Sequence, residues 1–114
     1  MEKLYNNARE RQVKIYCKRY NRIYLPKLIF NLMKDNYKND IQTVDIYIDN
    51  KQIKVVPNPT GEFSVCQNGS SPHGRNIALN KTAIKYYGVT EGNYPCDVDD
   101  NGNLIIKLER IEKC

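Results

Sequence analysis

The chain contains similar segments in tandem, and this repetition constrains its fold more than any other feature of the sequence. Residues 22–27 and residues 76–81 both read polar, Ile, X, Leu, X, Lys, with an offset of 81 − 27 = 54. Residues 49–55 and 100–106 are also similar, with an offset of 100 − 49 = 51. An insertion of 54 − 51 = 3 residues in the first half, around residues 35–39, accounts for the difference. The sequence therefore predicts two tandem copies of one unit.

The sequence predicts the same order of elements in both halves, namely strand, turn, strand, helix and β-hairpin. In the first half, the alternation of apolar and polar residues is typical of strands with one buried face. Pro26 suits the first turn of a helix, because the N–H that proline lacks would have no partner there. The predicted strands are Val13–Cys17, Arg22–Leu25, Val44–Ile48 and Ile53–Val56, and the predicted apolar face of the helix is Leu28, Ile29, Leu32 and Met33.

The second half repeats this order with a longer loop at Gln67–Arg75. A helix at Lys81–Tyr87 is predicted to end at Gly88, which adopts the left-handed conformation at low cost. Residues 99–102 end in Asn-Gly, a strong signal for a hairpin turn. Pro95 has no N–H to give to a ladder, so we expect it at the start of a strand or at an edge. The predicted strands are Phe63–Cys66, Ile77–Leu79, Tyr94–Val98 and Leu104–Leu108.

A chain of 114 residues is expected to form one domain. Its predicted parts are a first repeat at 13–56, a linker at 57–61, a second repeat at 62–108, and tails at 1–10 and 109–114. The linker is placed there because two prolines and a glycine resist both helix and ladder. Each repeat alone is too small to bury its apolar faces, so the two are expected to pack on each other. The predicted fold class is mostly β with short helices (α+β).

The positive charge of the chain lies in its first quarter. The net charge is +5, and residues 1–27 carry eight basic and two acidic side chains, or +6, so the rest of the chain sums to −1. Tyrosines interleave with these cations. Such a segment suits binding to the phosphate groups of a nucleic acid. A basic face that is merely solvated is the alternative.

The sequence offers no membrane segment and no metal site. No run approaches the ~18 apolar residues of a membrane span, and residues 1–4 lack the apolar stretch of a secretory signal. The four cysteines (Cys17, Cys66, Cys96 and Cys114) form no CxxC pair, and His73 is the single histidine. We therefore expect a cytoplasmic protein with reduced thiols, no cofactor and no metal.

The side chains that carry catalysis do not come together in the sequence. Cys66 is close to His73, but Gly69–Pro72 between them offers no rigid scaffold for a nucleophile and its base. The acidic residues near position 99 lack the ligand spacing of a calcium loop. The chain is therefore not expected to be an enzyme.

Two segments of the chain resemble a known family. Asn80–Ile106 is similar to the core of AbrB/SpoVT-like transition-state regulators, with Tyr87-Gly88-Val89 after the helix and Glu91-Gly92-Asn93 before the hairpin. Asn21–Pro26 is similar to the family's Gly-Arg-apolar-X-apolar-Pro stretch. Two copies in one chain resemble the tandem arrangement of MraZ-like proteins. The resemblance implies an intramolecular pseudo-dimer, that is, a swapped-hairpin β-barrel with a pseudo-two-fold axis, and a basic face that binds duplex DNA.

The resemblance also implies which residues contact DNA. The arginine before the second strand of the unit is Arg22, and Asn76 takes this place in the second half, with Arg75 before it. The basic residues of the family's helix are matched by Lys85, while Phe30 stands at such a position in the first half. The predicted nucleic-acid-binding residues are Lys18, Arg19, Arg22, Lys27, Arg75, Asn76, Lys81 and Lys85. We expect them to form one basic face.

The predicted function is therefore that of a DNA-binding transcriptional regulator. The alternative is a protein-binding module, including a phage-type inhibitor that occupies another protein's nucleic-acid-binding site, with an acidic protein as partner. A purely structural protein is the third possibility. The many Lys, Asn, Ile and Tyr residues suit an AT-rich bacterial or phage genome. Because tandem copies satisfy each other, a monomer or a loose homodimer is expected.

Overall fold

The computed structural model describes residues 11–18, 21–67, 74–79 and 87–108. The predicted helix Lys81–Tyr87 lies outside the described residues, except for Tyr87, which is part of a turn. The strands are β1 (Gln12–Tyr16), β2 (Arg22–Pro26), β3 (Thr43–Ile48), β4 (Gln52–Pro57), β5 (Phe63–Gln67), β6 (Gly74–Ala78), β7 (Gly92–Val98) and β8 (Leu104–Lys107), and helix α1 is Lys27–Tyr37.

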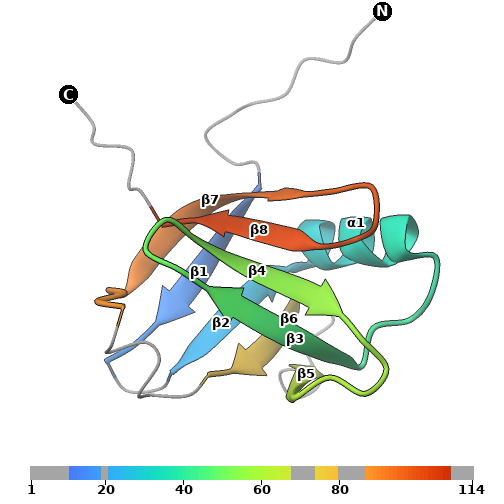
Figure 1. Ribbon diagram of the computed structural model, residues 1–114, viewed down its shortest axis with the longest axis horizontal. Helices are drawn as coiled ribbons and strands as arrows, with labels where there is room; N and C mark the ends of the chain where they lie inside the picture. Colours follow the sequence, from blue (N-terminus) through green and yellow to red (C-terminus); the bar gives the residue numbers. More distant parts are fainter. Residues whose placement is uncertain (1–10, 19–20, 68–73, 80–86, 109–114) are drawn as a thin grey trace, which may run out of the picture.

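The described strands close into an antiparallel barrel (Figure 1). Their order is β1-β2-β6-β5-β3-β4-β8-β7, and β7 pairs again with β1. In the view of Figure 1, β3, β4 and β8 form the near side, and β1, β2 and β6 lie behind them. The prediction of a mostly β chain that forms a barrel is confirmed. Closure leaves each described strand paired on both sides, so this part of the chain presents no free edge.

The core consists of the alternate residues of the strands that point into the barrel. In β2, Ile23 and Leu25 are fully buried, while Arg22 and Tyr24, which alternate with them, are half-buried on the outer side. A side-chain period of two produces this pattern. Each buried Ile or Leu contributes roughly 1.5–3 kcal/mol to folding. The buried apolar residues of the strands are Val13, Ile15, Ile23, Leu25, Val44, Ile53, Val55, Ile77, Tyr94, Cys96, Leu104 and Ile106.

Helix α1 begins and ends at residues suited to those places. Pro26 precedes the first helical residue and has a φ of −56°, so the ring that fixes φ also fits the end of β2. Lys38 follows the last residue in the left-handed conformation with a φ of 64°, and its N–H donates to the carbonyl of Lys34 at 2.8 Å. This hydrogen bond satisfies one of the carbonyls that a helix end leaves without a partner.

The buried face of α1 differs from the predicted one. Ile29, Phe30 and Met33 are buried, whereas Leu28 is 64% exposed. Leu28 was expected in the core, and this prediction was wrong because the buried stripe is rotated by about one position toward Phe30. The rotation places the ring of Phe30 beneath the guanidinium of Arg75, 4.9 Å from its centroid.

The β7–β8 turn packs directly on α1. The predicted Asn-Gly turn is confirmed: Gly102 has a φ of 85°, and its N–H donates to the carbonyl of Asp99 at 3.0 Å. A Cβ on Gly102 would lie 2.6 Å from the carbonyl oxygen of Met33 and 2.8 Å from Tyr37. The side-chain amide of Asn36 donates to the carbonyl of Asp99 at 2.9 Å. The helix of the first half is thus held by a turn of the second half.

The strands around the second loop are longer than predicted. Gln67 belongs to β5, and Gly74 and Arg75 belong to β6, so the predicted loop Gln67–Arg75 was too long. Gln67 and Arg75 pair with each other, which extends the β5–β6 ladder toward the loop. Pro57, predicted as the first linker residue, is the last residue of β4.

Pro95 was expected at the start of a strand or at an edge, but it is an interior residue of β7, a strand of the closed barrel that pairs with both β1 and β8. It pairs with Gln12 of β1. The N–H of Cys96 donates to the carbonyl of Arg11 at 2.7 Å, so Arg11 and Cys96 form a hydrogen-bonded pair. Hydrogen-bonded and non-hydrogen-bonded pairs alternate along an antiparallel ladder, so the next pair, Gln12 and Pro95, is a non-hydrogen-bonded one. The nitrogen of Pro95 therefore faces β8, where pairing begins only at Cys96. Proline is tolerated because it lies at the end of that ladder.

Candidate nucleic-acid interface

On one outer face of the barrel, the described strand residues include cations and no Asp or Glu. On β1, β2, β5 and β6 the residues that alternate with the core residues share this face. Lys14 pairs with Tyr24, and Tyr16 pairs with Arg22, so these four outward side chains lie side by side. We call this surface the basic sheet face, and its residues are Gln12, Lys14, Tyr16, Arg22, Tyr24, Ser64, Cys66, Gly74, Asn76 and Ala78.

Tyr16 organises the cations of this face. The ammonium of Lys14 lies 4.9 Å from the centroid of the Tyr16 ring, and the guanidinium of Arg22 lies 4.8 Å from it. Cations at this distance are attracted to the ring, by roughly 0.5–1 kcal/mol at an exposed site. The two positive charges are therefore kept close together on neighbouring strands.

Tyr24 lies across the neighbouring strand β6. A Cβ on Gly74 would lie 2.6 Å from the hydroxyl oxygen of Tyr24, so the ring occupies the space that a side chain at position 74 would need. Asn76 pairs with Tyr24 and is 8% exposed. Its Oδ1 is buried and accepts no hydrogen bond from the described residues.

Glu91 fixes the start of the β1–β2 loop. Its Oε1 accepts the backbone N–H groups of Cys17 at 3.2 Å and of Lys18 at 3.3 Å. These hydrogen bonds, together with the nearby charges of Lys18 and Lys14, hold the pKa of Glu91 below its ordinary value. The Cys17 thiol donates to the carbonyl of Val89 at 3.6 Å, so three hydrogen bonds tie this loop to the segment before β7.

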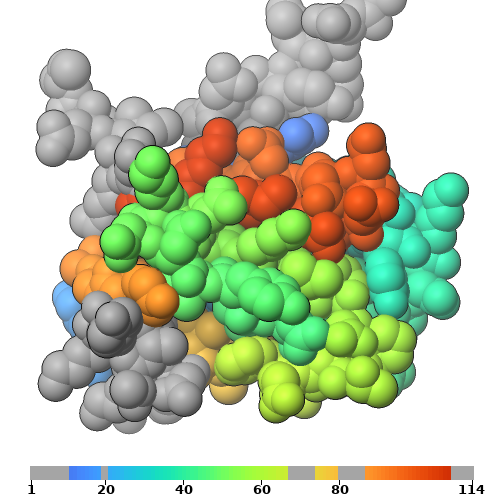
Figure 2. Space-filling view, viewed as in Figure 1, coloured from blue at the N-terminus to red at the C-terminus, as the bar shows by residue number. Residues whose placement is uncertain are grey.

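The opposite outer face has balanced charge. Figure 2 shows this side, with β3 and β4 in green and β7 and β8 in orange to red. Its outward charged residues on the strands are Asp45, Lys54, Asp97 and Lys107, two acidic and two basic. Lys107 is 3.5 Å from Asp97, which also pairs with Arg11 at 3.4 Å. The excess of positive charge on the strands therefore belongs to the basic sheet face.

The predicted site residues of the first half lie along the β1–β2 hairpin and at the start of α1. Lys18 is exposed just after β1, and Arg22 is the first residue of β2 on the basic sheet face. Lys27 is exposed as the first residue of α1, at the other end of β2. Arg19 lies outside the described residues.

The predicted site residues of the second half are arranged differently. Arg75 pairs with Leu25, so it has the parity of the core residues, and its guanidinium covers Phe30. Arg22 pairs with Ala78, which places Arg22 and Arg75 at opposite ends of the β2–β6 ladder. Asn76 is on the basic sheet face but buried. Lys81 and Lys85 lie outside the described residues.

The predicted set did not include Lys14, Tyr16 and Tyr24, which are the cationic and aromatic residues that accompany Arg22 on the basic sheet face. The signal was present in the sequence. Residues 12, 14 and 16 are the polar positions of an alternating strand, so their side chains must all point to the same, outer side of the sheet. What the sequence lacked was the pairing that brings them beside Arg22.

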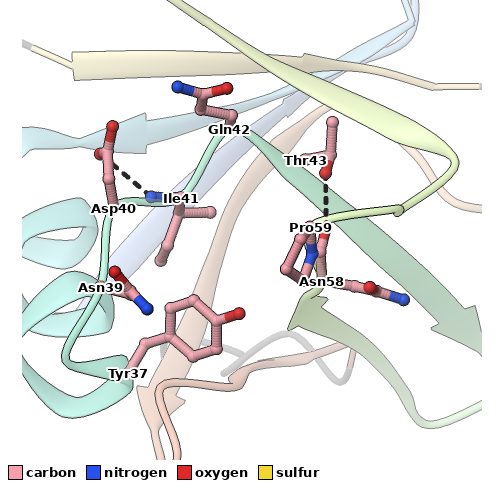
Figure 3. A pocket seen from close by; sticks show the side chains of 8 residues that line it. All are labelled: Tyr37, Asn39, Asp40, Ile41, Gln42, Thr43, Asn58 and Pro59. Carbon is pink, nitrogen blue, oxygen red and sulfur yellow. Dashed lines mark hydrogen bonds between the residues drawn. The ribbon is translucent and has the colours of Figure 1, made fainter.

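A pocket of about 250 Å³ lies between the end of α1 and the β4–β5 connection (Figure 3). Tyr37 and Ile41 lie on one side of it, and Asn58 and Pro59 lie on the other. The hydroxyl of Thr43 donates to the carbonyl of Asn58, which holds the two sides together. Asp40 is the single carboxylate among the lining residues, and its Oδ1 accepts the N–H of Ile41 at 3.0 Å.

The described cysteines are free thiols. Within the described ranges, no group of three or more His, Cys, Asp or Glu residues is arranged to hold a metal ion. No helix in this part of the chain is long and apolar enough to cross a membrane. A comparison with models of protein families found no matching family, and comparisons with curated proteins and with solved structures found no match either.

Proposed function

We propose that this protein binds duplex DNA through the basic sheet face, as a regulator of AbrB-like type. The observation that carries the proposal is the charge of the two outer faces. Lys14 and Arg22 lie together on a face whose described strand residues include no Asp or Glu, while the opposite face is balanced. Phosphate groups attract such a face, and the contacts position the protein on the duplex.

The exposed cations at the two ends of β2 extend this surface. Lys18 follows β1 and Lys27 begins α1, so both add positive charge next to the face. Arg22 stands where the loop enters the strand, the position that the family resemblance assigns to base contact. Its fork of donors suits the acceptor atoms of guanine in the major groove.

We propose further that the barrel consists of two equivalent repeats. The support is the strand order. If β1, β2, β3 and β4 correspond to β5, β6, β7 and β8, exchanging the labels gives β5-β6-β2-β1-β7-β8-β4-β3, which is the observed closed order read in the other direction. An arbitrary order of strands would not survive this exchange.

The registers support the same proposal. In the β2–β6 ladder, Arg22 pairs with Ala78 and Tyr24 pairs with Asn76; since 22 + 54 = 76 and 24 + 54 = 78, each pair is the image of the other. The β4–β8 ladder behaves in the same way with the offset of 51, because Ile53 pairs with Ile106 and Val55 with Leu104. These are the two offsets that the sequence alone indicates.

The other two ladders that join the halves, β1–β7 and β3–β5, obey a third offset. Val13 pairs with Tyr94, and Val44 pairs with Phe63. Since 13 + 50 = 63 and 44 + 50 = 94, each of these two pairs is the image of the other. Such an intramolecular pseudo-dimer satisfies its own pairing, which supports a monomer in solution.

The proposed function is tested with a fluorescently labelled random duplex and fluorescence anisotropy at several salt concentrations. Binding to phosphate makes log K fall linearly with log salt, with a slope of about −0.9 per phosphate neutralised. A linear fall with a slope of roughly −2 or steeper is expected. If no binding is detected at low salt, the regulator proposal fails, and an acidic protein becomes the partner to seek for the same face.

A further inference from the structure

The two halves of the basic sheet face differ in chemistry. Under the proposed correspondence of the repeats, Lys14 and Tyr16 of β1 have Ser64 and Cys66 of β5 as their images, by the offset of 50. Arg22 and Tyr24 of β2 have Asn76 and Ala78 of β6, by the offset of 54. All four cationic and aromatic side chains belong to the first half, and their images are small or neutral.

The burial of Asn76 reinforces the difference. Arg22 is stacked on Tyr16 at the face, whereas its image Asn76 is 8% exposed beside Tyr24. Tyr24 leans over β6 toward Gly74, so a side chain of the first half also covers part of the second half of the face. The described strand residues of the second half of this face thus lack the charges of the first.

A protein with true two-fold symmetry binds two equivalent half-sites, so its DNA site is an inverted repeat. We infer that this chain, although folded as a pseudo-dimer, engages duplex DNA through the first half of the basic sheet face. The duplex then lies off the pseudo-two-fold axis in a single orientation, and the preferred site is not an inverted repeat. This inference rests on the proposed DNA binding and adds the class of site.

The inference follows from where phosphate contacts arise. Binding energy is gained where cations neutralise phosphates, and neutral residues such as Ser64 and Ala78 release no counterions. A duplex centred on the axis would place half of its contact area over those neutral residues. A duplex displaced toward β1 and β2 meets Lys14 and Arg22 together, with Lys18 beside them.

A charge swap between image positions tests the inference. Lys14→Ser removes one cation from the first half, Ser64→Lys adds one to the second, and the double variant keeps the net charge. Ser64 is exposed, so the added lysine has space on the outer side. The salt slope of log K is measured for wild type and the three variants, after circular dichroism has confirmed that each is folded.

Lys14→Ser should flatten the slope by about 0.9, and Ser64→Lys should leave it unchanged. The double variant should then behave like Lys14→Ser alone. If the double variant regains the wild-type slope, both halves contact the duplex equally and the inference is overturned. If wild type does not bind DNA, the proposed function itself fails, which is a different result.

Selection of sites from a random duplex library gives a second reading. A consensus that is not self-complementary supports the inference, and a self-complementary consensus overturns it. If selection returns no consensus, the charge swap decides, because it does not depend on sequence preference.

Discussion

The contact between α1 and the β7–β8 turn can be measured with two glycine substitutions. Gly102 and Gly88 both have positive φ, at 85° and 65°. They differ in surroundings. A Cβ on Gly102 meets the backbone of Met33 and Tyr37 at 2.6 and 2.8 Å, whereas no described atom lies within 4 Å of a Cβ on Gly88. Gly88→Ala is therefore the matched control for Gly102→Ala.

The cost of each variant follows from these surroundings. Holding alanine in the left-handed region costs ~1–2 kcal/mol at either position. At Gly102 the crowded backbone atoms must also move, which adds ~1–3 kcal/mol. The restriction of the unfolded chain is common to both substitutions and cancels in their difference. Gly102→Ala should thus lower the free energy of unfolding by ~1–3 kcal/mol more than Gly88→Ala.

Thermal and urea denaturation followed by circular dichroism measure this difference. With an unfolding entropy of about 2.1 cal/mol/K per residue, 1 kcal/mol shifts the Tm of a chain of this length by about 4 °C. Gly102→Ala should therefore melt roughly 4–12 °C below Gly88→Ala. Equal melting temperatures for the two variants would refute the close packing of α1 on the turn.

Three further predictions use other parts of the molecule. The pKa of Glu91 is held below its ordinary value of 4.5, so the stabilisation that Glu91 provides is present above that pH and is lost as the pH falls through the folded pKa. Glu91→Gln should therefore lose less unfolding free energy than wild type when the pH is lowered. An equal loss in both proteins would contradict the role of the Glu91 carboxylate in holding the β1–β2 loop. Burial raises the pKa of the Cys96 thiol to about 12, so peptide mass spectrometry after iodoacetamide treatment at neutral pH should find Cys96 alkylated far more slowly than the exposed Cys66, and equal rates would be incompatible with the core position of Cys96. Sedimentation should give a monomer at micromolar concentration, because each half of the barrel pairs with the other, whereas an obligate dimer would mean that hairpins are exchanged between chains.

The sequence predicted the elements of the barrel well where a single physical signal dominates. Alternation located β1 and β3 to within a residue, and Asn-Gly located the β7–β8 turn. Predictions that depend on neighbours were less accurate. The exposure of Leu28 and the burial of Phe30 follow from how α1 sits over the barrel, which helical spacing alone does not determine.

Pro95 and Arg75 also show that predictions from the sequence are less accurate where they depend on neighbouring strands. Pro95 is acceptable inside β7 because its nitrogen faces a place where the β8 ladder has ended, and this depends on the register between strands far apart in sequence. Arg75 was predicted at the DNA face because it lies where the loop enters a strand, but strand parity directs it toward Phe30. Lys14 was overlooked as a site residue because its closeness to Arg22 arises from the β1–β2 pairing.

The central claim, that DNA binds the basic sheet face, is tested most directly by comparing two variants of equal charge. Lys14→Ala with Arg22→Ala removes two cations from the basic sheet face, and Lys54→Ala with Lys107→Ala removes two from the opposite face. Anisotropy titrations with one labelled duplex at several salt concentrations compare both variants with wild type. The first variant should bind more weakly, with a salt slope flatter by roughly 1.8, and the second should keep a slope near that of wild type. Equal losses in the two variants, or a larger loss in the second, would contradict the claim.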